Sequence, residues 1–206
     1  MMFRALLIGD SHVPDRAREL PSQLKTRLTE VGKFDAVLFT GDVVRSREVP
    51  RLLEGLAKSR KEVFLVQGNM DAFAGVDLPE FQLVDLALDV SAALFHGHQV
   101  HRRGDHRLLL AHADKFDAQL VVTGHTHAHD VHLDEKSGRL LLNPGSCTGA
   151  WSFVATGTPS FVVVALDDAG GGELVLEVKL ERLVGGRWSA EKWLFRVAGG
   201  RVHPFR

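Results

Sequence analysis

The sequence predicts an α/β protein in which two β-sheets pack face to face, with helices on their outer sides. The first two-thirds of the 206 residues alternate between short apolar runs and segments of helical periodicity, a pattern typical of a parallel sheet with crossover helices. The last third consists mostly of strand-like runs separated by glycine turns. No repeat or low-complexity linker divides the chain, so we expect residues 1–206 to form a single domain.

The N-terminal part predicts a β-α-β-α-β series. Residues 3–8 are expected to form a buried strand that ends at Gly9-Asp10. Apolar residues at helical spacing then mark two amphipathic helices, the first by Leu20, Leu24, Leu28 and Val31 and the second by Val49, Leu52, Leu53 and Leu56. The apolar runs 36–39 and 63–66 are the second and third strands. This order predicts parallel strands with right-handed crossovers.

The rest of the chain predicts more strands than helices. Residues 82–95 read as two strands joined near Asp89, and a helix over 108–116 leads into a strand at 120–122. Residues 161–166 form a nearly continuous apolar strand, and residues 174–180 alternate as a half-buried one. Gly185-Gly186 is a hairpin signal that precedes a strand near 193–197.

Composition excludes several classes of function. The net charge of −1 provides no basic field for nucleic acid or an anionic membrane. The single cysteine, Cys147, cannot form an intramolecular disulfide and suits a reducing compartment. The N-terminal apolar run is interrupted by Asp10 and is too short for a signal peptide or a membrane span. We therefore expect a soluble cytoplasmic protein without direct membrane insertion.

Residues of metal-binding types follow almost every predicted strand. In chain order they are Asp10 and His12, Asp42, Asn69, His96, and His125 and His127. Because open α/β sheets bind ligands at the carboxyl ends of their strands, we expect all seven to meet at one edge of the sheet. One such motif alone is usually turn chemistry, but seven ligands in this order suit two ions that share a carboxylate. Glycines beside these residues would let the backbone approach the ions closely.

These motifs resemble the calcineurin-like metallophosphoesterase superfamily. The resemblance rests on Gly9-Asp10-Ser11-His12, Gly41-Asp42, Gly68-Asn69-Met70-Asp71, His96-Gly97-His98 and Gly124-His125-Thr126-His127. It implies a four-layer αββα sandwich. It also implies a first metal site of Asp10, His12, Asp42 and His127, and a second of Asp42, Asn69, His96 and His125, bridged by Asp42. Carboxylate, amide and imidazole ligands favour two divalent ions such as manganese, zinc or iron, with magnesium possible.

A narrower resemblance extends beyond the metal motifs. The stretches His96-Gly97-His98-Gln99-Val100, Asn143-Pro144-Gly145-Ser146, Thr148-Gly149-Ala150-Trp151 and Pro159-Ser160-Phe161-Val162 are similar to the family of small retromer subunits. That family implies an endosomal sorting scaffold, which docks on a large α-solenoid subunit and reaches endosomes through its partners. The alternative is a free-standing metal-dependent phosphodiesterase of the prokaryotic type.

Catalysis is less clearly indicated than metal binding. Many active members of the superfamily have a histidine after the Gly-Asn pair, where this chain has Met70, which cannot transfer a proton. His98 is the candidate catalytic residue that could supply the proton, and a hydrogen-bonding role beside the ligands is the alternative. We expect Cys147 to be a packed, inert thiol, and exposed aromatic residues such as Trp151 and Phe153 to form a docking patch.

Overall fold

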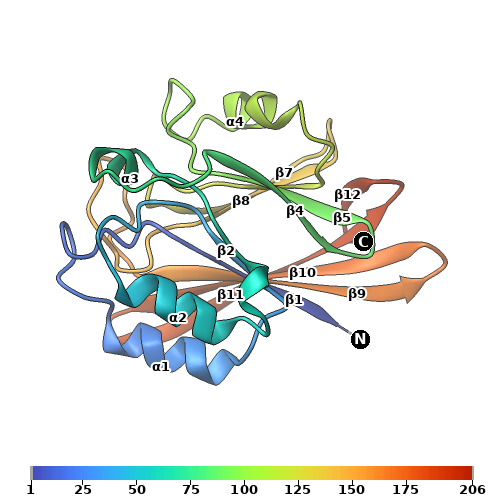
Figure 1. Ribbon diagram of the computed structural model, residues 1–206. Helices are drawn as coiled ribbons and strands as arrows, with labels where there is room; N and C mark the ends of the chain where they lie inside the picture. Colours follow the sequence, from blue (N-terminus) through green and yellow to red (C-terminus); the bar gives the residue numbers. More distant parts are fainter. Residues whose placement is uncertain (1, 206) are drawn as a thin grey trace.

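Two sheets form the inner layers of the computed structural model, which describes residues 2–205 (Figure 1). The seven-stranded sheet has the order β12-β11-β10-β9-β1-β2-β3, and the five-stranded sheet has the order β4-β5-β6-β8-β7. The strands are β1 Phe3–Ile8, β2 Ala36–Phe39, β3 Val63–Leu65, β4 Phe81–Ala87, β5 Val90–Phe95, β6 Leu120–Val122, β7 His129–Asp134, β8 Arg139–Pro144, β9 Ser160–Gly170, β10 Glu173–Val184, β11 Arg187–Ala198 and β12 Arg201–Pro204.

Helices cover the outer side of each sheet. Helices α1 (Ser22–Val31) and α2 (Glu48–Leu56) lie on the seven-stranded sheet, and α4 (His106–Ala113) lies on the five-stranded one (Figure 1). The short α3 (Asn69–Phe73) follows β3 at one end of the sandwich. This confirms the αββα sandwich. Within the described residues, no helix has the length and apolarity that a membrane span requires.

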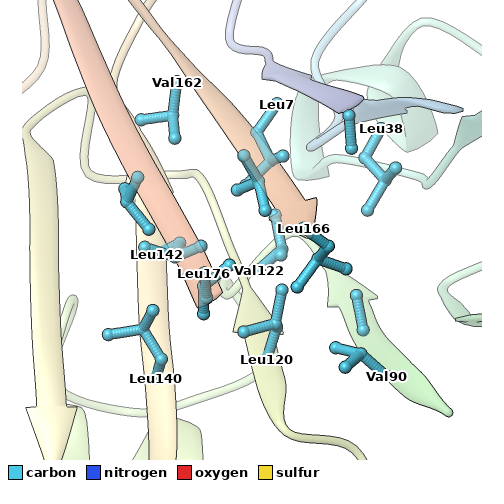
Figure 2. Close-up of a cluster of buried hydrophobic side chains, with 14 of the residues drawn as sticks. Leu7, Leu38, Val90, Leu120, Val122, Leu140, Leu142, Val162, Leu166 and Leu176 are labelled. Atoms are coloured by element: carbon cyan, nitrogen blue, oxygen red, sulfur yellow. The ribbon is translucent and has the colours of Figure 1, made fainter. Parts of the chain in front are cut away.

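The core between the sheets is built from aliphatic side chains. Figure 2 shows Leu7 and Leu38 of one sheet facing Leu120, Leu140 and neighbouring residues of the other. A second apolar layer joins the seven-stranded sheet to α1 and α2, and a third joins the five-stranded sheet to α4. Strand β1 is apolar from Ala5 to Ile8 because alternate residues face different layers, Leu7 the inter-sheet core and Leu6 the helices.

The parallel series is confirmed, since β1 pairs with β2 and β2 with β3 in parallel. Several predicted boundaries are wrong. The fourth helix begins at His106 rather than 108, because the side chain of Asp105 accepts a hydrogen bond from the N–H of Leu108 and caps it. It ends at Ala113 rather than 116. Strand β11 begins at Arg187, well before the predicted strand near 193, because it pairs with β10 over its whole length.

Candidate metal centre

The seven proposed ligands lie at one end of the sandwich, but the expectation that one sheet supplies them is wrong. Asp10 and Asp42 follow β1 and β2 of the seven-stranded sheet, and Asn69 follows β3. His96 and His125 follow β5 and β6 of the five-stranded sheet. The backbone N–H of His125 donates to both carboxylate oxygens of Asp10, at 3.2 and 3.1 Å. The centre is therefore assembled where the two sheets face each other.

The backbone at this centre is unusual. Five of the proposed ligands have positive φ values: Asp10 (50°), His12 (48°), Asp42 (59°), His125 (68°) and His127 (58°). The left-handed region is uncommon for residues other than glycine and costs free energy, and it concentrates at functional sites. These conformations turn successive side chains toward one point.

Two glycines allow this convergence. A Cβ atom at Gly68 would lie 2.0 Å from Oδ1 of Asp42, and one at Gly124 would lie 2.5 Å from Oδ2 of Asp10. No side chain fits at either place, because real Cβ contacts do not fall below about 3 Å. The backbone therefore approaches Asp42 and Asp10 closely at these positions, and its approach to the ions stays a prediction.

Four of the seven residues form a tight group. Asp10, His12, Asp42 and His127 are buried, and one ligand atom from each lies within 4.8 Å of the others. Nε2 of His12 is 3.2 Å from Oδ2 of Asp42, and Nε2 of His127 is 3.4 Å from Oδ1 of Asp10. These are the residues that the resemblance assigns to the first metal site. The structure thus contains a candidate metal-binding cluster at that place.

Asp42 also contacts the residues proposed for a second ion. Its Oδ2, the oxygen nearest His12, is 3.4 Å from Nε2 of His96. The same nitrogen of His96 is 3.2 Å from Oδ1 of Asn69. The ring of His125 is centred 5.1 Å from that of His96. One oxygen of Asp42 therefore lies between both groups, as a bridging ligand requires.

Backbone carbonyl groups orient two of the imidazoles. Nδ1 of His96 donates to the carbonyl of Thr40 at 2.6 Å, and Nδ1 of His127 donates to the carbonyl of Ala150 at 2.8 Å. When Nδ1 carries the proton, Nε2 has a free lone pair directed into the cluster. These hydrogen bonds set the tautomer that a metal ligand needs.

Burial and the nearby carboxylates shift the pKa values of the histidines in this cluster. Burial lowers the pKa of His12 to about 4, and burial with the charge of His96 lowers the pKa of His125 to about 3. Burial opposes protonation of His96 as well, but its hydrogen bond to Asp42 and the charges of Asp10 and Asp42 raise its pKa to about 9. Burial would raise the pKa of Asp42, yet His96 holds it below its usual range.

These features fit a cation-binding cluster. Nε2 of His12 and Nε2 of His127 are 2.9 Å apart, so both nitrogens are directed at the same place in the cluster. Nδ1 of His12 is buried without a hydrogen-bond partner among the described residues. Asp10 and Asp42 raise the pKa of His96 and so favour a second proton on its ring, and a divalent ion at Nε2 would supply the positive charge in place of that proton. Carboxylate, amide and imidazole donors suit manganese, zinc or iron.

His98 lies next to this group. Its ring is centred 5.4 Å from that of His96 and 6.2 Å from that of His125. Burial and then the charge of His96 lower the pKa of His98, a direction that favours the hydrogen-bonding role beside the ligands over proton donation.

Asp71 is a structural residue of this centre that sequence reasoning missed. Its buried carboxylate accepts backbone hydrogen bonds from Asp42 at 2.7 Å, Gly68 at 2.8 Å and Val44 at 2.6 Å. It therefore joins the loop that carries Asp42 to the loop that carries Asn69. Its position in Gly68-Asn69-Met70-Asp71 was the only signal in the sequence.

Replacing this carboxylate should loosen both loops. We expect Asp71→Ala to lower the free energy of unfolding, because each buried N–H left without a partner costs about 1–3 kcal/mol. It should also weaken zinc binding, since the two ligand loops lose their shared anchor. Urea denaturation and zinc titration of the variant measure both effects. The exposed Asp77, on the same segment, is the control: an equal effect of Asp77→Ala would contradict the assignment.

The opposite side of the centre is held by polar side chains of the Asn-Pro-Gly-Ser loop. Nδ2 of Asn143 donates to the carbonyl of Gly124 and to Oγ1 of Thr126, at 2.9 and 3.0 Å. The hydroxyl of Ser146 donates to the carbonyl of Asp10 at 2.7 Å. Cys147 is buried, and burial raises the pKa of its thiol, so the thiol stays protonated and unreactive.

The fold and this cluster agree with comparisons to known proteins. A family model, the calcineurin-like phosphoesterase superfamily domain, matches residues 3–169. A probable metallophosphoesterase of Methanothermobacter thermautotrophicus is 34% identical over 142 residues, which are 69% of this chain and 76% of that protein. The chain belongs to the calcineurin-like phosphoesterase superfamily.

Within the superfamily, the structure is similar to Vps29. Vacuolar Protein Sorting 29 from Cryptosporidium parvum superposes with a TM-score of 0.79 at 33% identity, covering 94% of this chain and 98% of that chain. Wild-type Vps29 of Entamoeba histolytica complexed with Zn²⁺ superposes with a TM-score of 0.77 at 31% identity, covering 93% and 99%. The predicted likeness to the small retromer subunit is thus supported over nearly the whole chain.

Proposed function

We propose that the chain is a retromer-type sorting scaffold, a rigid subunit that docks on a large α-solenoid partner. The observation that carries this proposal is the full-length similarity to Vps29, which extends well beyond the metal motifs. A protein of this kind would reach endosomes through its partners, which are the α-solenoid subunit and the associated retromer subunits. Neither nucleic acid nor direct membrane insertion has a part in the proposal.

The surface around the metal centre suits a docking role. Phe73, at the end of α3, is 90% exposed, and Phe153 and Trp151 are 84% and 64% exposed. The rings of Trp151 and Phe153 pack against each other with centroids 4.9 Å apart. The side chain of Arg16 donates to the carbonyl of Trp151 at 3.1 Å and braces the loop. Exposed aromatic residues on a rigid support are common anchors of protein interfaces.

Affinity purification from the source cells, followed by identification of the recovered proteins, tests the scaffold proposal. We expect the tagged chain to recover a large α-solenoid protein at near-equal stoichiometry. The double variant Trp151→Ala, Phe153→Ser should reduce this recovery at least about tenfold, because interface anchors often contribute 2 kcal/mol or more. Leu194→Ser, at an exposed site on β11, is the control. Recovery without any solenoid protein would contradict the proposal.

A second candidate function is a free-standing phosphodiesterase. The intact ligand group favours it, as does the similarity to the archaeal metallophosphoesterase. Two bound ions would polarise the phosphoryl group and supply an activated water. In this chain, Asp42 would bridge the ions, and His98 would be the candidate residue for assisting the reaction beside them. A prokaryotic source would favour this candidate over the scaffold.

A further inference from the structure

Three side chains of metal-binding types meet on the outer side of the five-stranded sheet, the side on which α4 lies (Figure 1). They are His106, the first residue of α4, and Asp130 and His132 of β7. We call them the α4–β7 cluster. None of them is among the seven proposed ligands, and the function proposed above uses none of them.

The alternation of β7 brings two of these side chains to one face. Val131 and Leu133 pack against the core between the sheets. Asp130 and His132 alternate with them and therefore point to the opposite, outer face, about 7 Å apart along the strand. Because β7 lies at the edge of its sheet, this face is bordered by solvent on one side.

Helix α4 places His106 against both residues. Nε2 of His106 donates to Oδ2 of Asp130 at 2.5 Å. The ring of His106 is centred 4.1 Å from that of His132, with 32° between the ring planes. The side chain of Asp105 caps α4 through the N–H of Leu108, which fixes the start of the helix and with it the position of His106.

The cluster is open to solvent, as a site that takes up an ion must be. The side chains of His106 and Asp130 are 37% and 40% exposed, and His132 is half-buried. Asp134, the next residue on the same face of β7, is already engaged, because its carboxylate accepts a hydrogen bond from the N–H of Ser137 at 2.9 Å. The accessible donors are therefore two imidazoles and one carboxylate.

This donor set suits one zinc ion. Zinc binds histidine nitrogen and carboxylate oxygen at about 2.0–2.2 Å, and three protein ligands commonly leave its fourth position to water. Two tetrahedral ligand atoms at that range lie about 3.3 Å apart, so His106 and Asp130 need to separate by only about 1 Å to hold the ion between them. Imidazole favours zinc over magnesium and manganese, which prefer oxygen donors.

The cluster should bind zinc more weakly than the metal centre does. Its three ligand groups do not lie within 4.8 Å of one another, as those of the tight group at the metal centre do. His132 has to turn from its stacked position to place a nitrogen on the ion, and ordering a half-exposed side chain costs affinity. Zinc supplied at two ions per chain should thus load the metal centre and leave the cluster open.

We propose that the α4–β7 cluster binds a single zinc ion through His106, Asp130 and His132, with water as the fourth ligand. This ion is additional to the two assigned to the metal centre. It would tie the start of α4 to the edge strand β7, two segments that are far apart in the sequence.

Calorimetric titration of zinc into protein that already holds two zinc ions per chain tests the proposal. We expect one further binding event in the wild type. His106→Ala, His132→Ala and Asp130→Asn should each weaken that event at least about tenfold, because removing even a group that only supports a ligand typically costs about 10–100-fold in metal affinity. Asp130→Asn keeps the size of the side chain and so disturbs the fold least.

His101→Ala is the matched control, since His101 is an exposed histidine in the segment before α4. It should bind the further ion as the wild type does. Native mass spectrometry of each variant at two zinc ions per chain should show the metal centre still loaded, which separates loss of the cluster from loss of the fold.

Two results would overturn the inference. If the wild type with a loaded metal centre takes up no further zinc at submillimolar concentration, the cluster is only a hydrogen-bonded pair with a ring stacked on it. If the further ion binds with wild-type affinity in all three cluster variants, or is lost equally in His101→Ala, it binds at another place.

Discussion

Phosphodiester hydrolysis by this chain is expected to depend steeply on the leaving group. Met70 follows Asn69 at the start of α3, at the position where the superfamily resemblance implies a histidine, and its backbone N–H donates to Oδ1 of Asp42 at 2.9 Å. A thioether supplies no proton, and general-acid assistance is typically worth about 10²–10⁴-fold. With manganese, bis-aryl phosphodiesters should therefore be hydrolysed slowly. Alkyl esters should be hydrolysed about 10²–10⁴-fold more slowly still.

Restoring the acid should act selectively. Met70→His should increase kcat for alkyl esters by at least about tenfold and change kcat for bis(p-nitrophenyl) phosphate little, because good leaving groups need the proton least. Steady-state rates on both substrates measure the contrast, and Met70→Leu is the control for side-chain shape. Equal gains on both substrates would mean that Met70 is not beside the leaving group. If no variant with bound ions hydrolyses either substrate, the phosphodiesterase candidate fails and the scaffold is the one function that remains.

Divalent ions are expected to stabilise the folded chain strongly. An ion that binds only the folded state adds RT ln(1 + [L]/Kd), about 2.7 kcal/mol at a hundredfold excess over Kd. For a chain of this size that corresponds to an increase in Tm of roughly 5–10 °C. Zinc or manganese should thus raise Tm by this amount in a thermal denaturation experiment. The ligand group supplies the physical reason, since Asp10 and Asp42 lie close together and lose their repulsion when a cation binds.

The bridging residue provides the sharpest variant for that experiment. Asp42→Ala should abolish most of the increase in Tm, because Oδ2 of Asp42 faces both His12 and His96. Asp167→Ala, at an exposed site on β9 far along the strand from the centre, should keep the full increase. A metal-induced shift of wild-type size in Asp42→Ala would show that the ions bind elsewhere.

Three short strands rich in apolar residues, β1, β2 and β6, have the predicted bounds. β8 (Arg139–Pro144) was not predicted, although its residues from Leu140 to Pro144 are buried. β7 was not predicted as an element because all its residues are only partly buried and it carries His129, Asp130, His132 and Asp134. Helix α3 has five residues, too few to show a helical period.

The residues of the candidate site could be named from the sequence, and their arrangement could not. The strand-end motifs identified the seven proposed ligands that the structure brings to one end of the sandwich. They could not indicate that His96 and His125 come from a second sheet, because sheet membership depends on pairing between distant segments. The role of Asp71 could not be predicted from its place in Gly68-Asn69-Met70-Asp71, since it accepts hydrogen bonds from the backbone of Asp42 and Val44, which are remote in the sequence. The ligand roles themselves stay a prediction.

Metal stoichiometry tests the central claim, a two-ion centre bridged by Asp42, most directly. Native mass spectrometry of the zinc-reconstituted protein should give two ions per chain. It should give one ion for His127→Ala, which removes a ligand of the first site alone, and none for Asp42→Ala at the same zinc concentration. A single ion in the wild type, or two ions retained by Asp42→Ala, would contradict the account.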